Sequence, residues 1–283
     1  MTLNTIVLDL DGTLLNSSKT ISPKTKEALI HLQTKGIRVI LASGRPSSGM
    51  IDIARSLSMH RHHGRIIAFN GACALEMSTL EPIIEHFIEA PLAQKLLAHL
   101  ENYLLIPMVS QDNRLYVNSV FNGMIHLGPH PKEDDPLFNI IEYEATGGHF
   151  LLQEVGSLAQ HVNFPVYKVL VAGEPDYLHD QQSIMFGPFK DILHGSFSAP
   201  FYYEFTHPDA DKAKTLRKLV MDPSTVIAFG DSQNDISLLQ YAHVGIAMGN
   251  AADDVKRIAD DITATNDEEG IYHSLLTYFP DLF

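Results

Sequence analysis

Two acidic clusters in this chain each follow a short apolar segment. Residues 9–13 read Asp-Leu-Asp-Gly-Thr after the apolar run 5–8, and residues 230–235 read Gly-Asp-Ser-Gln-Asn-Asp after the run 226–229. Alone, the first cluster fits a polar turn at the end of a strand equally well, and the second is better explained as an Asx-type turn that caps a helix. Together they could converge on a hard, oxygen-seeking cation such as Mg²⁺.

Three further positions could hold an anion beside that cation. Ser43 offers a hydroxyl and Gly44 an unhindered backbone N–H, and both follow the apolar run 37–41. Lys212 adds a positive charge near the start of a helical segment, where the helix dipole also favours anions. Lys212 could equally be a solvated surface lysine, as most lysines are.

Two familiar motifs are excluded. The glycine and the closing glutamate of a calcium EF-hand are not at the required positions after Asp9. The spacing from Gly44 to Gly49 is that of a P-loop, but Met50 and Ile51 stand where lysine and serine or threonine are required.

The elements that must position these residues alternate in type. Apolar runs at 5–8, 37–41, 66–69 and 226–229 are separated by helical patterns, which predicts buried parallel strands with helical crossovers. The first helix has Ser22 as its N-cap, Pro23 at its first position and Gly36 just past its end. Ligands bind at the carboxyl ends of strands in such sheets, so the two acidic clusters should lie at one rim.

The pattern changes after about residue 82. A helix with leucines at 92, 96, 97 and 100 leads into a hairpin around Asp112, and short strands are predicted at 150–152 and 166–171. The strand and helix alternation resumes at 226, with a strand at 244–248 and a helix at 253–259. We therefore expect a core of residues 1–83 and 201–283, and an inserted α+β domain of residues 84–200 with a long loop at 123–135.

Composition limits the class of protein. A chain of 283 residues with 45% hydrophobic content can bury a core, and its net charge of −14 opposes nucleic-acid binding. We find no apolar stretch of about 18 residues for a membrane helix and no secretory signal. The single cysteine, Cys73, cannot form an internal disulfide. We expect a cytoplasmic protein with neither a nucleic-acid nor a membrane partner, and leave the oligomeric state open.

In order along the chain, these motifs resemble those of the haloacid dehalogenase superfamily, and more narrowly its Cof-type phosphatases of subclass IIB. The likeness extends to Phe-Asn-Gly-Ala at 69–72 and Ala-Met-Gly-Asn-Ala at 247–251. It implies an α/β fold: a Rossmann-like core, with a parallel sheet flanked by helices, and an inserted α/β cap domain that closes over the substrate.

The resemblance also implies catalytic roles. Asp9 would be the nucleophile and a Mg²⁺ ligand, and Asp11 the general acid and base, with its backbone carbonyl on the metal. Asp231 would be the other protein ligand, and Asp235 would support the metal from outside its coordination sphere. Asp11 would have to start protonated in order to protonate the leaving group, and Thr13 would orient it.

The same resemblance assigns a phosphate site. The side chains of Ser43, Lys212 and Asn234 would hold the transferring phosphoryl group, with backbone help from Leu10 and Gly44. Near Lys212 the chain departs from the family pattern, because Ala213 stands where a glycine commonly follows the lysine.

The principal hypothesis is Mg²⁺-dependent hydrolysis of a small phosphomonoester through an aspartyl phosphate. Related proteins accept sugar phosphates, pyridoxal phosphate or flavin mononucleotide, so these are the substrate classes that the resemblance implies. The motifs also fit a phosphomutase acting on a sugar phosphate. A regulator that binds a phosphometabolite with little turnover is disfavoured, because binding alone has no need of the acid and base Asp11.

No histidine is assigned a catalytic or metal-binding role from the sequence. His60, His62 and His63 lie among arginines and glycine, and we interpret them as a solvated loop rather than a transition-metal site. His126 and His130 fall within the expected insertion and could contact a substrate there.

Overall fold

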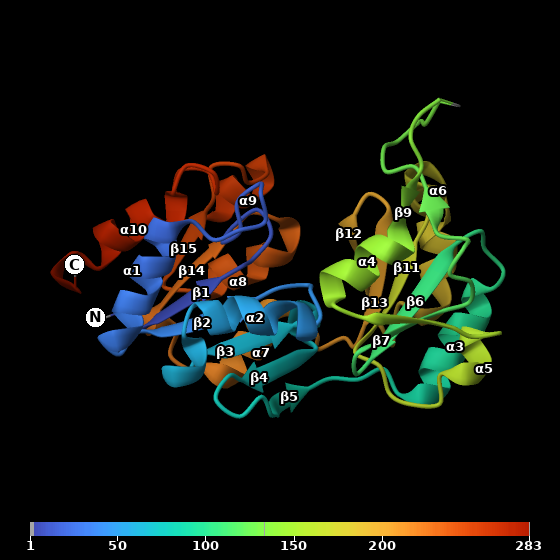
Figure 1. Ribbon diagram of the computed structural model, residues 1–283, viewed down its shortest axis with the longest axis horizontal. Coiled ribbons are helices and arrows are strands. Elements are labelled where there is room, and N and C mark those ends of the chain that lie inside the picture. Colours follow the sequence, from blue (N-terminus) through green and yellow to red (C-terminus); the bar gives the residue numbers. More distant parts are fainter. Residues whose placement is uncertain (1–2, 133, 283) are drawn as a thin grey trace. The chain divides into compact units, whose positions relative to one another are not determined.

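The computed structural model describes residues 3–132 and 134–282 (Figure 1). The chain forms two compact units. Unit 1 contains the described residues up to Ile84 and those from Asp211 onward, and unit 2 is Glu85–Ala210. Within the described ranges, no helix is long and apolar enough to cross a membrane.

Unit 1 is built on an eight-stranded sheet. In spatial order its strands are β16 (Asp261–Ile262), β15 (Val244–Ala247), β14 (Val226–Gly230), β1 (Thr5–Leu8), β2 (Arg38–Ala42), β3 (Arg65–Ala68), β4 (Cys73–Glu76) and β5 (Pro82–Glu85). Every pairing from β16 to β3 is parallel, and β4 joins β3 in the antiparallel sense. The predicted parallel α/β sheet is confirmed. The antiparallel strand β4 at its edge was not predicted.

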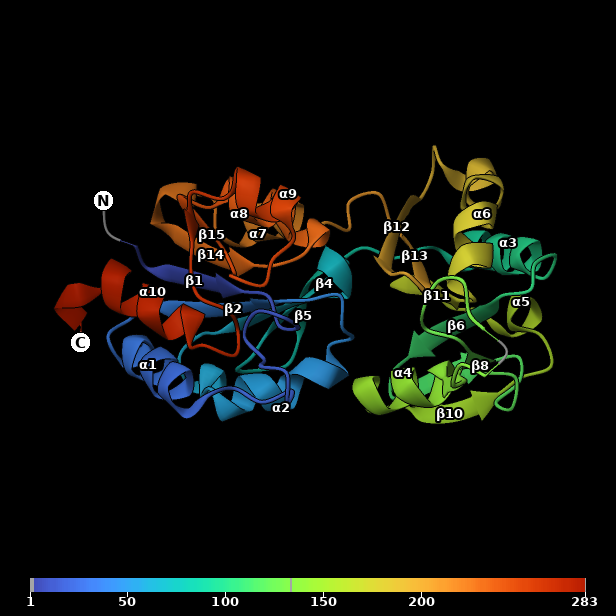
Figure 2. The ribbon, with the colours of Figure 1, turned by 90° about the horizontal axis from the view of Figure 1, so that it is seen from above.

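Helices cover both faces of this sheet (Figure 2). One face carries α1 (Pro23–Thr34), α2 (Ser48–Ser56) and α10 (Gly270–Tyr278), and the other carries α7 (Lys212–Leu219), α8 (Ile236–Tyr241) and α9 (Asp253–Ile258). Val7 and Ile40 pack on the second face against Leu216 and Leu238. Both faces are apolar and buried, which is why the strands read as continuous hydrophobic runs.

The start of α1 follows the predicted signals. Ser22 is the N-cap, its hydroxyl accepts a hydrogen bond from the backbone N–H of Thr25 at 3.2 Å, and Pro23 opens the helix. Past the end of the helix, Gly36 has a φ of +90°, a conformation that favours glycine.

Short 3-10 helices complete the helical elements. They are η1 (Met59–Arg61), η2 (Phe69–Gly71), η3 (Gly187–Phe189), η4 (Pro223–Thr225), η5 (Gln233–Asp235) and η6 (Pro280–Leu282).

Unit 2 has its own six-stranded sheet. In spatial order the strands are β10 (Leu151–Glu154), β7 (Arg114–Val117), β6 (Ile106–Gln111), β11 (Lys168–Ala172), β13 (Tyr202–Thr206) and β12 (His194–Ala199). The helices are α3 (Ala90–Leu100), α4 (Ile140–Gly148), α5 (Leu158–His161) and α6 (Pro175–Phe186). The predicted hairpin around Asp112 is confirmed, since Gln111 pairs with Arg114 across it.

Two apolar cores flank the sheet of unit 2. Leu97 of α3 and Leu178 of α6 pack with Phe205 on one face, and Ile141 of α4 packs with Leu170 on the other. The expected long loop at 123–135 contains β8 (Met124–Ile125), which pairs with β9 (Phe138–Asn139), and one of its positions, 133, lies outside the described residues.

The second unit ends later than the expected return to the core at residue 201. Strand β13 pairs with β11, and its side chains Tyr203 and Phe205 are buried in the core of unit 2. The return therefore falls at Asp211, after β13 rather than before it.

A buried ion pair joins β11 to β13. Nζ of Lys168 lies 3.0 Å from Oε1 of Glu204, and the two side chains are only 7% and 5% exposed. Burial alone would lower the pKa of Lys168, but Glu204 and Glu144 more than offset this, so the pKa is raised. The charged lysine is therefore the stable form in the folded protein.

We expect Glu204→Gln to lower the free energy of unfolding at pH 7 by about 3–5 kcal/mol, because it leaves a buried ammonium without this partner. The raised pKa also predicts a pH dependence in the natural chain. The contribution of Lys168 to the free energy of unfolding is fully present below pH 10.5, and it is lost as the pH rises through the pKa of Lys168 in the folded protein. Urea denaturation across this pH range measures both effects. In the control, Lys168→Met with Glu204→Met should recover most of the loss; equal destabilisation in the single and double variants would contradict the assignment.

Candidate active site

The candidate site lies at the carboxyl ends of the central strands of unit 1. Strand β1 lies between β14 and β2, with Leu8 opposite Phe229 on one side and Leu41 on the other. Asp9 immediately follows β1 and is 6% exposed. The chain after β14 and the chain after β2 therefore reach the same rim on either side of Asp9.

Lys212 connects two of the carboxylates at this rim. Its Nζ donates to Oδ1 of Asp9 and to Oδ1 of Asp235, both at 2.7 Å, and the lysine is 1% exposed. The alternative of a solvated surface lysine is thus excluded. Lys212 is the first residue of α7, which begins at the N-cap Asp211, whose carboxylate accepts the N–H of Lys214 at 2.7 Å.

Asp235 holds the loop after β14 in shape. Its Oδ2 accepts the backbone N–H groups of Asp231 and Ser232, each at 3.1 Å, while its Oδ1 accepts from Lys212. The residue is fully buried. Its oxygens are thus engaged by the protein, which suits a residue that positions Asp231 and Lys212.

Thr13 and Gly12, in the turn after β1, both lie against Asp231. The hydroxyl of Thr13 donates to Oδ1 of Asp231 at 3.1 Å, whereas Thr13 was expected to orient Asp11. Gly12 has a φ of +80°, and a Cβ atom added there would lie 2.4 Å from Oδ2 of Asp231. The tight turn after β1 therefore brings backbone, rather than a side chain, against Asp231.

The three aspartates suit a divalent cation. One carboxylate oxygen from each of Asp9, Asp231 and Asp235 lies within 4.8 Å of the others. Burial and the neighbouring Asp235 raise the pKa of Asp9 to about 8, although Lys212 acts in the opposite direction. Burial and Asp235 also raise the pKa of Asp231. Three carboxylates against one ammonium leave two negative charges, and an all-oxygen site with that excess fits Mg²⁺.

The Asp11 side chain is paired with two cations. Arg45 donates through Nε and Nη2 to its two oxygens, both at 2.7 Å, and Nζ of Lys19 lies 2.7 Å from Oδ1. Burial favours the neutral acid, but these contacts outweigh it and hold the pKa of Asp11 below its ordinary value. In this arrangement Asp11 is ionised, whereas an acid that protonates a leaving group must begin protonated.

The predicted phosphate ligands lie around the neighbouring strand ends. Ser43 is buried after β2, and its hydroxyl accepts the N–H of Arg45 at 3.2 Å. A Cβ atom on Gly44 would lie 3.2 Å from the amide of Asn70, and that amide oxygen accepts from Nδ2 of Asn234 at 3.0 Å. Leu10 is fully buried in the turn between Asp9 and Asp11.

Sequence reasoning gave no role to three residues that the structure places here. Arg45 and Lys19 form ion pairs with Asp11. Asn70 accepts a hydrogen bond from Asn234 and lies against Gly44. Asn70 stands within the Phe-Asn-Gly-Ala motif at 69–72, and Arg45 directly follows Ser43 and Gly44, so the signal was present for both. Lys19 lies in a loop, and nothing in its sequence context singles it out.

Comparison with known proteins gives consistent results. A family model described as haloacid dehalogenase-like hydrolase matches residues 6–275. The crystal structure of a haloacid dehalogenase-like hydrolase from Bacteroides thetaiotaomicron is similar over 98% of this chain and 100% of its own, with 30% identity and a TM-score of 0.86.

Two curated proteins of Bacillus subtilis are also similar over nearly their whole length. The 5-amino-6-(5-phospho-D-ribitylamino)uracil phosphatase YitU is 28% identical over 284 residues, which cover 97% of each chain. Phosphatase YwpJ is 27% identical over 296 residues, which cover 95% of this chain and 98% of its own.

We expect Gly12→Ala to weaken Mg²⁺ binding at least about tenfold and to lower the free energy of unfolding by about 1–3 kcal/mol, because the added methyl group displaces Asp231 and strains the turn. Isothermal titration with Mg²⁺ and urea denaturation measure the two effects. Gly36→Ala is the matched control: its φ is also positive, but a Cβ atom there meets nothing within 4 Å. Equal Mg²⁺ affinity in the two variants would show that Gly12 does not shape the site.

Proposed function

The chain belongs to the haloacid dehalogenase-like hydrolase family and is a phosphatase, and on this premise we propose that it hydrolyses small phosphomonoesters through an aspartyl phosphate on Asp9, with Mg²⁺ as cofactor. The observation that carries the proposal is the buried Asp9 carboxylate, held 2.7 Å from Nζ of Lys212 and surrounded by Asp231 and Asp235. A candidate nucleophile, one ammonium group and the carboxylates that could hold a cation thus lie together.

The cation would be held by the carboxylates of Asp9 and Asp231 and by the backbone carbonyl of Asp11. When bound, it supplies positive charge that offsets the repulsion between a carboxylate and a phosphate dianion. Lys212 adds to this effect and holds the attacking carboxylate of Asp9 in place. Oδ1 of Asp235 accepts a second hydrogen bond from Nζ of Lys212, which keeps the ammonium group directed at Asp9.

The phosphoryl oxygens that neither the cation nor Lys212 contacts also need hydrogen-bond donors. We assign these to the hydroxyl of Ser43, the amide of Asn234 and the backbone N–H groups of Leu10 and Gly44. Ser43 and Gly44 follow the strand beside β1, and Asn234 follows the strand on its other side. Donors on both sides of Asp9 would orient the phosphorus atom toward the attacking oxygen.

Asp11 would serve as acid in the first half of the reaction and as base in the second. It would protonate the departing alkoxide and then take a proton from the water that attacks the aspartyl phosphate. Because Arg45 and Lys19 stabilise its ionised form, Asp11 must leave these contacts before it can act as an acid. Arg45 and Lys19 would thereby control when the acid is available.

For the substrate we propose a phosphorylated sugar, sugar alcohol or related small metabolite. The support is the similarity to YitU, whose name describes a substrate with a phosphorylated ribityl chain. Unit 2 would act as the cap that selects the leaving group, as the resemblance to the family implies.

Asp9→Asn should preserve the fold and reduce turnover of an aryl phosphate about a thousandfold or more, because the amide cannot form the acyl phosphate. Phosphate release in the presence of Mg²⁺ is the measurement, and addition of a chelator should abolish it in the natural chain. Asp52→Asn is the control, since Asp52 is 73% exposed on α2 and should leave turnover unchanged. Retained activity in Asp9→Asn would refute the proposal.

Asp11→Asn should separate the two halves of the reaction. An aryl phosphate has a leaving group that needs no acid, so the first step still proceeds, but the water that should cleave the acyl phosphate lacks its base. We expect a burst of one equivalent of phenol per chain followed by arrest, and a mass increase of one phosphoryl group on the peptide that carries Asp9. Steady turnover without a burst would exclude the assigned base.

Incubation with a panel of sugar phosphates distinguishes hydrolysis from phosphoryl transfer. A phosphatase releases one inorganic phosphate per substrate consumed, whereas a phosphomutase yields an isomeric sugar phosphate. We expect stoichiometric phosphate release, and an isomerised product without it would replace the hydrolase assignment.

A further inference from the structure

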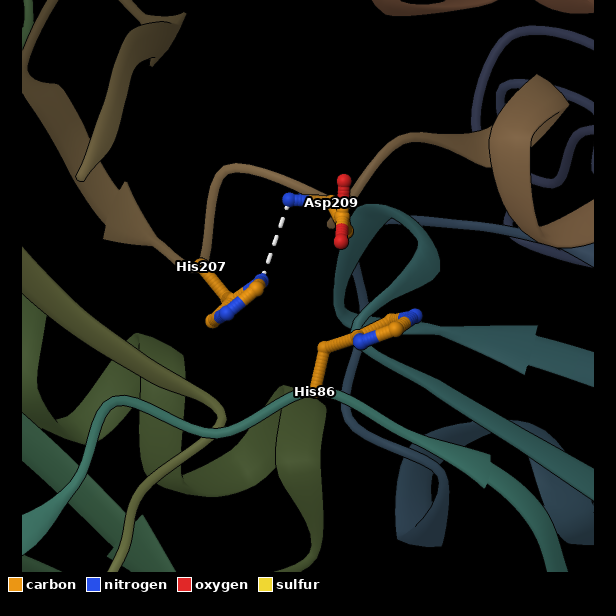
Figure 3. A group of neighbouring side chains, drawn as sticks. All are labelled: His86, His207 and Asp209. Atoms are coloured by element: carbon orange, nitrogen blue, oxygen red, sulfur yellow. Dashed lines mark hydrogen bonds between the residues drawn. The ribbon is translucent and has the colours of Figure 1, made fainter. Parts of the chain in front are cut away.

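Three side chains with metal-binding atoms meet in unit 2, apart from the aspartates of unit 1. His86 lies between β5 and α3, and His207 and Asp209 lie between β13 and α7 (Figure 3). One nitrogen from each histidine and one carboxylate oxygen from Asp209 all lie within 4.8 Å of one another. The two chain segments involved are far apart in sequence.

One strand positions both segments. Val166, just before β11, exchanges two backbone hydrogen bonds with Ile88, at 2.8 and 3.0 Å. Two residues further on, Lys168 of β11 pairs with Thr206 of β13. His86 is therefore two residues before one paired position, and His207 directly follows the other. The convergence of the histidines is a consequence of backbone pairing rather than of side-chain placement alone.

The side chains of this cluster lie close together and reach solvent. The rings of His86 and His207 are stacked, with centroids 5.3 Å apart and an interplanar angle of 16°. The backbone N–H of Asp209 donates to Nδ1 of His207 at 3.1 Å, which keeps the Asp209 residue against that ring. Both histidines are half-buried and Asp209 is exposed, so an ion could enter from solvent.

We propose that His86, His207 and Asp209 bind a divalent transition-metal ion of the zinc type. Two imidazoles and one carboxylate form a mixed nitrogen and oxygen set, which suits Zn²⁺, Co²⁺ or Ni²⁺ and does not suit Mg²⁺. Ligand bonds of about 2.0–2.2 Å require the three ligand atoms to approach by small side-chain rotations. These rotations break the hydrogen bond from the backbone N–H of Asp209 to Nδ1 of His207 and replace it with a bond to the ion. The N–H is exposed and can donate to water instead.

The expected site is open, with three protein ligands and water in the remaining positions. The bound ion would cross-link the segment before α3 to the segment after β13. Ion binding would then stabilise the folded chain, because the ligands are assembled only there.

The test uses the full chain and Co²⁺ as a spectroscopic probe, with Mg²⁺ in large excess to occupy the aspartates of unit 1. We expect visible absorption that saturates at one Co²⁺ per chain, and Zn²⁺ should displace it. His86→Asn and Asp209→Asn should each weaken Co²⁺ binding at least about tenfold. Asp209 is exposed, so its substitution tests the site even if His86→Asn alters the packing of its segment.

Two controls determine where the ion binds. The triple substitution His60→Asn, His62→Asn and His63→Asn removes a group of histidines in unit 1, of which His60 and His63 are exposed, and it should leave Co²⁺ binding unchanged. Asp231→Asn should also leave it unchanged, which makes the result independent of the proposed phosphatase mechanism. Unaltered binding in Asp209→Asn and His86→Asn, or a loss of binding in either control, would overturn the proposal.

Discussion

The whole rim of unit 1 depends on the ammonium group of Lys212. It lies between Asp9 and Asp235 in a place closed to water, and it is the cation in direct contact with the two buried carboxylates. Burying such charges costs several kcal/mol each unless they are paired in good geometry. The pairing links the end of β1 to α7 and to the loop after β14, which follow more than 200 residues later in the sequence. The same pairing therefore holds in place the Asp9 carboxylate that we propose as the attacking group.

Lys212 offsets only one of the three carboxylate charges at this rim, and the two negative charges that remain bear on the chemistry of the site. Burial and the charge of the neighbouring Asp235 raise the pKa values of Asp9 and Asp231. A fold selected only for stability would gain by neutralising the remaining charges with further basic or apolar side chains. A short turn instead keeps Gly12 against Asp231, where even a Cβ atom would lie 2.4 Å from Oδ2 of the carboxylate. Perturbed pKa values of this kind are typical of functional sites.

Much of the fold and of the site could be predicted from sequence because both rest on local signals. The strand runs, the cap at Ser22 and the acidic turn after β1 are each set within a few residues. Partner choice is not local. Thr13 bonds Asp231 rather than Asp11, and Lys19 reaches Asp11 from a loop. The end of unit 2 was misplaced since only the pairing of β13 with β11 decides it. Such facts depend on which segments meet in three dimensions.

The pairing of β11 has a consequence for how such a chain could arise. Its neighbouring positions Val166 and Lys168 hold the residues next to the entrance and the exit of unit 2, so both ends of this long excursion are adjacent. A segment whose ends are adjacent can be exchanged for another of different length without stretching the sheet from which it departs. With the role that we propose for unit 2, recognition of new leaving groups could therefore evolve by replacement of a whole module, while unit 1 is inherited unchanged.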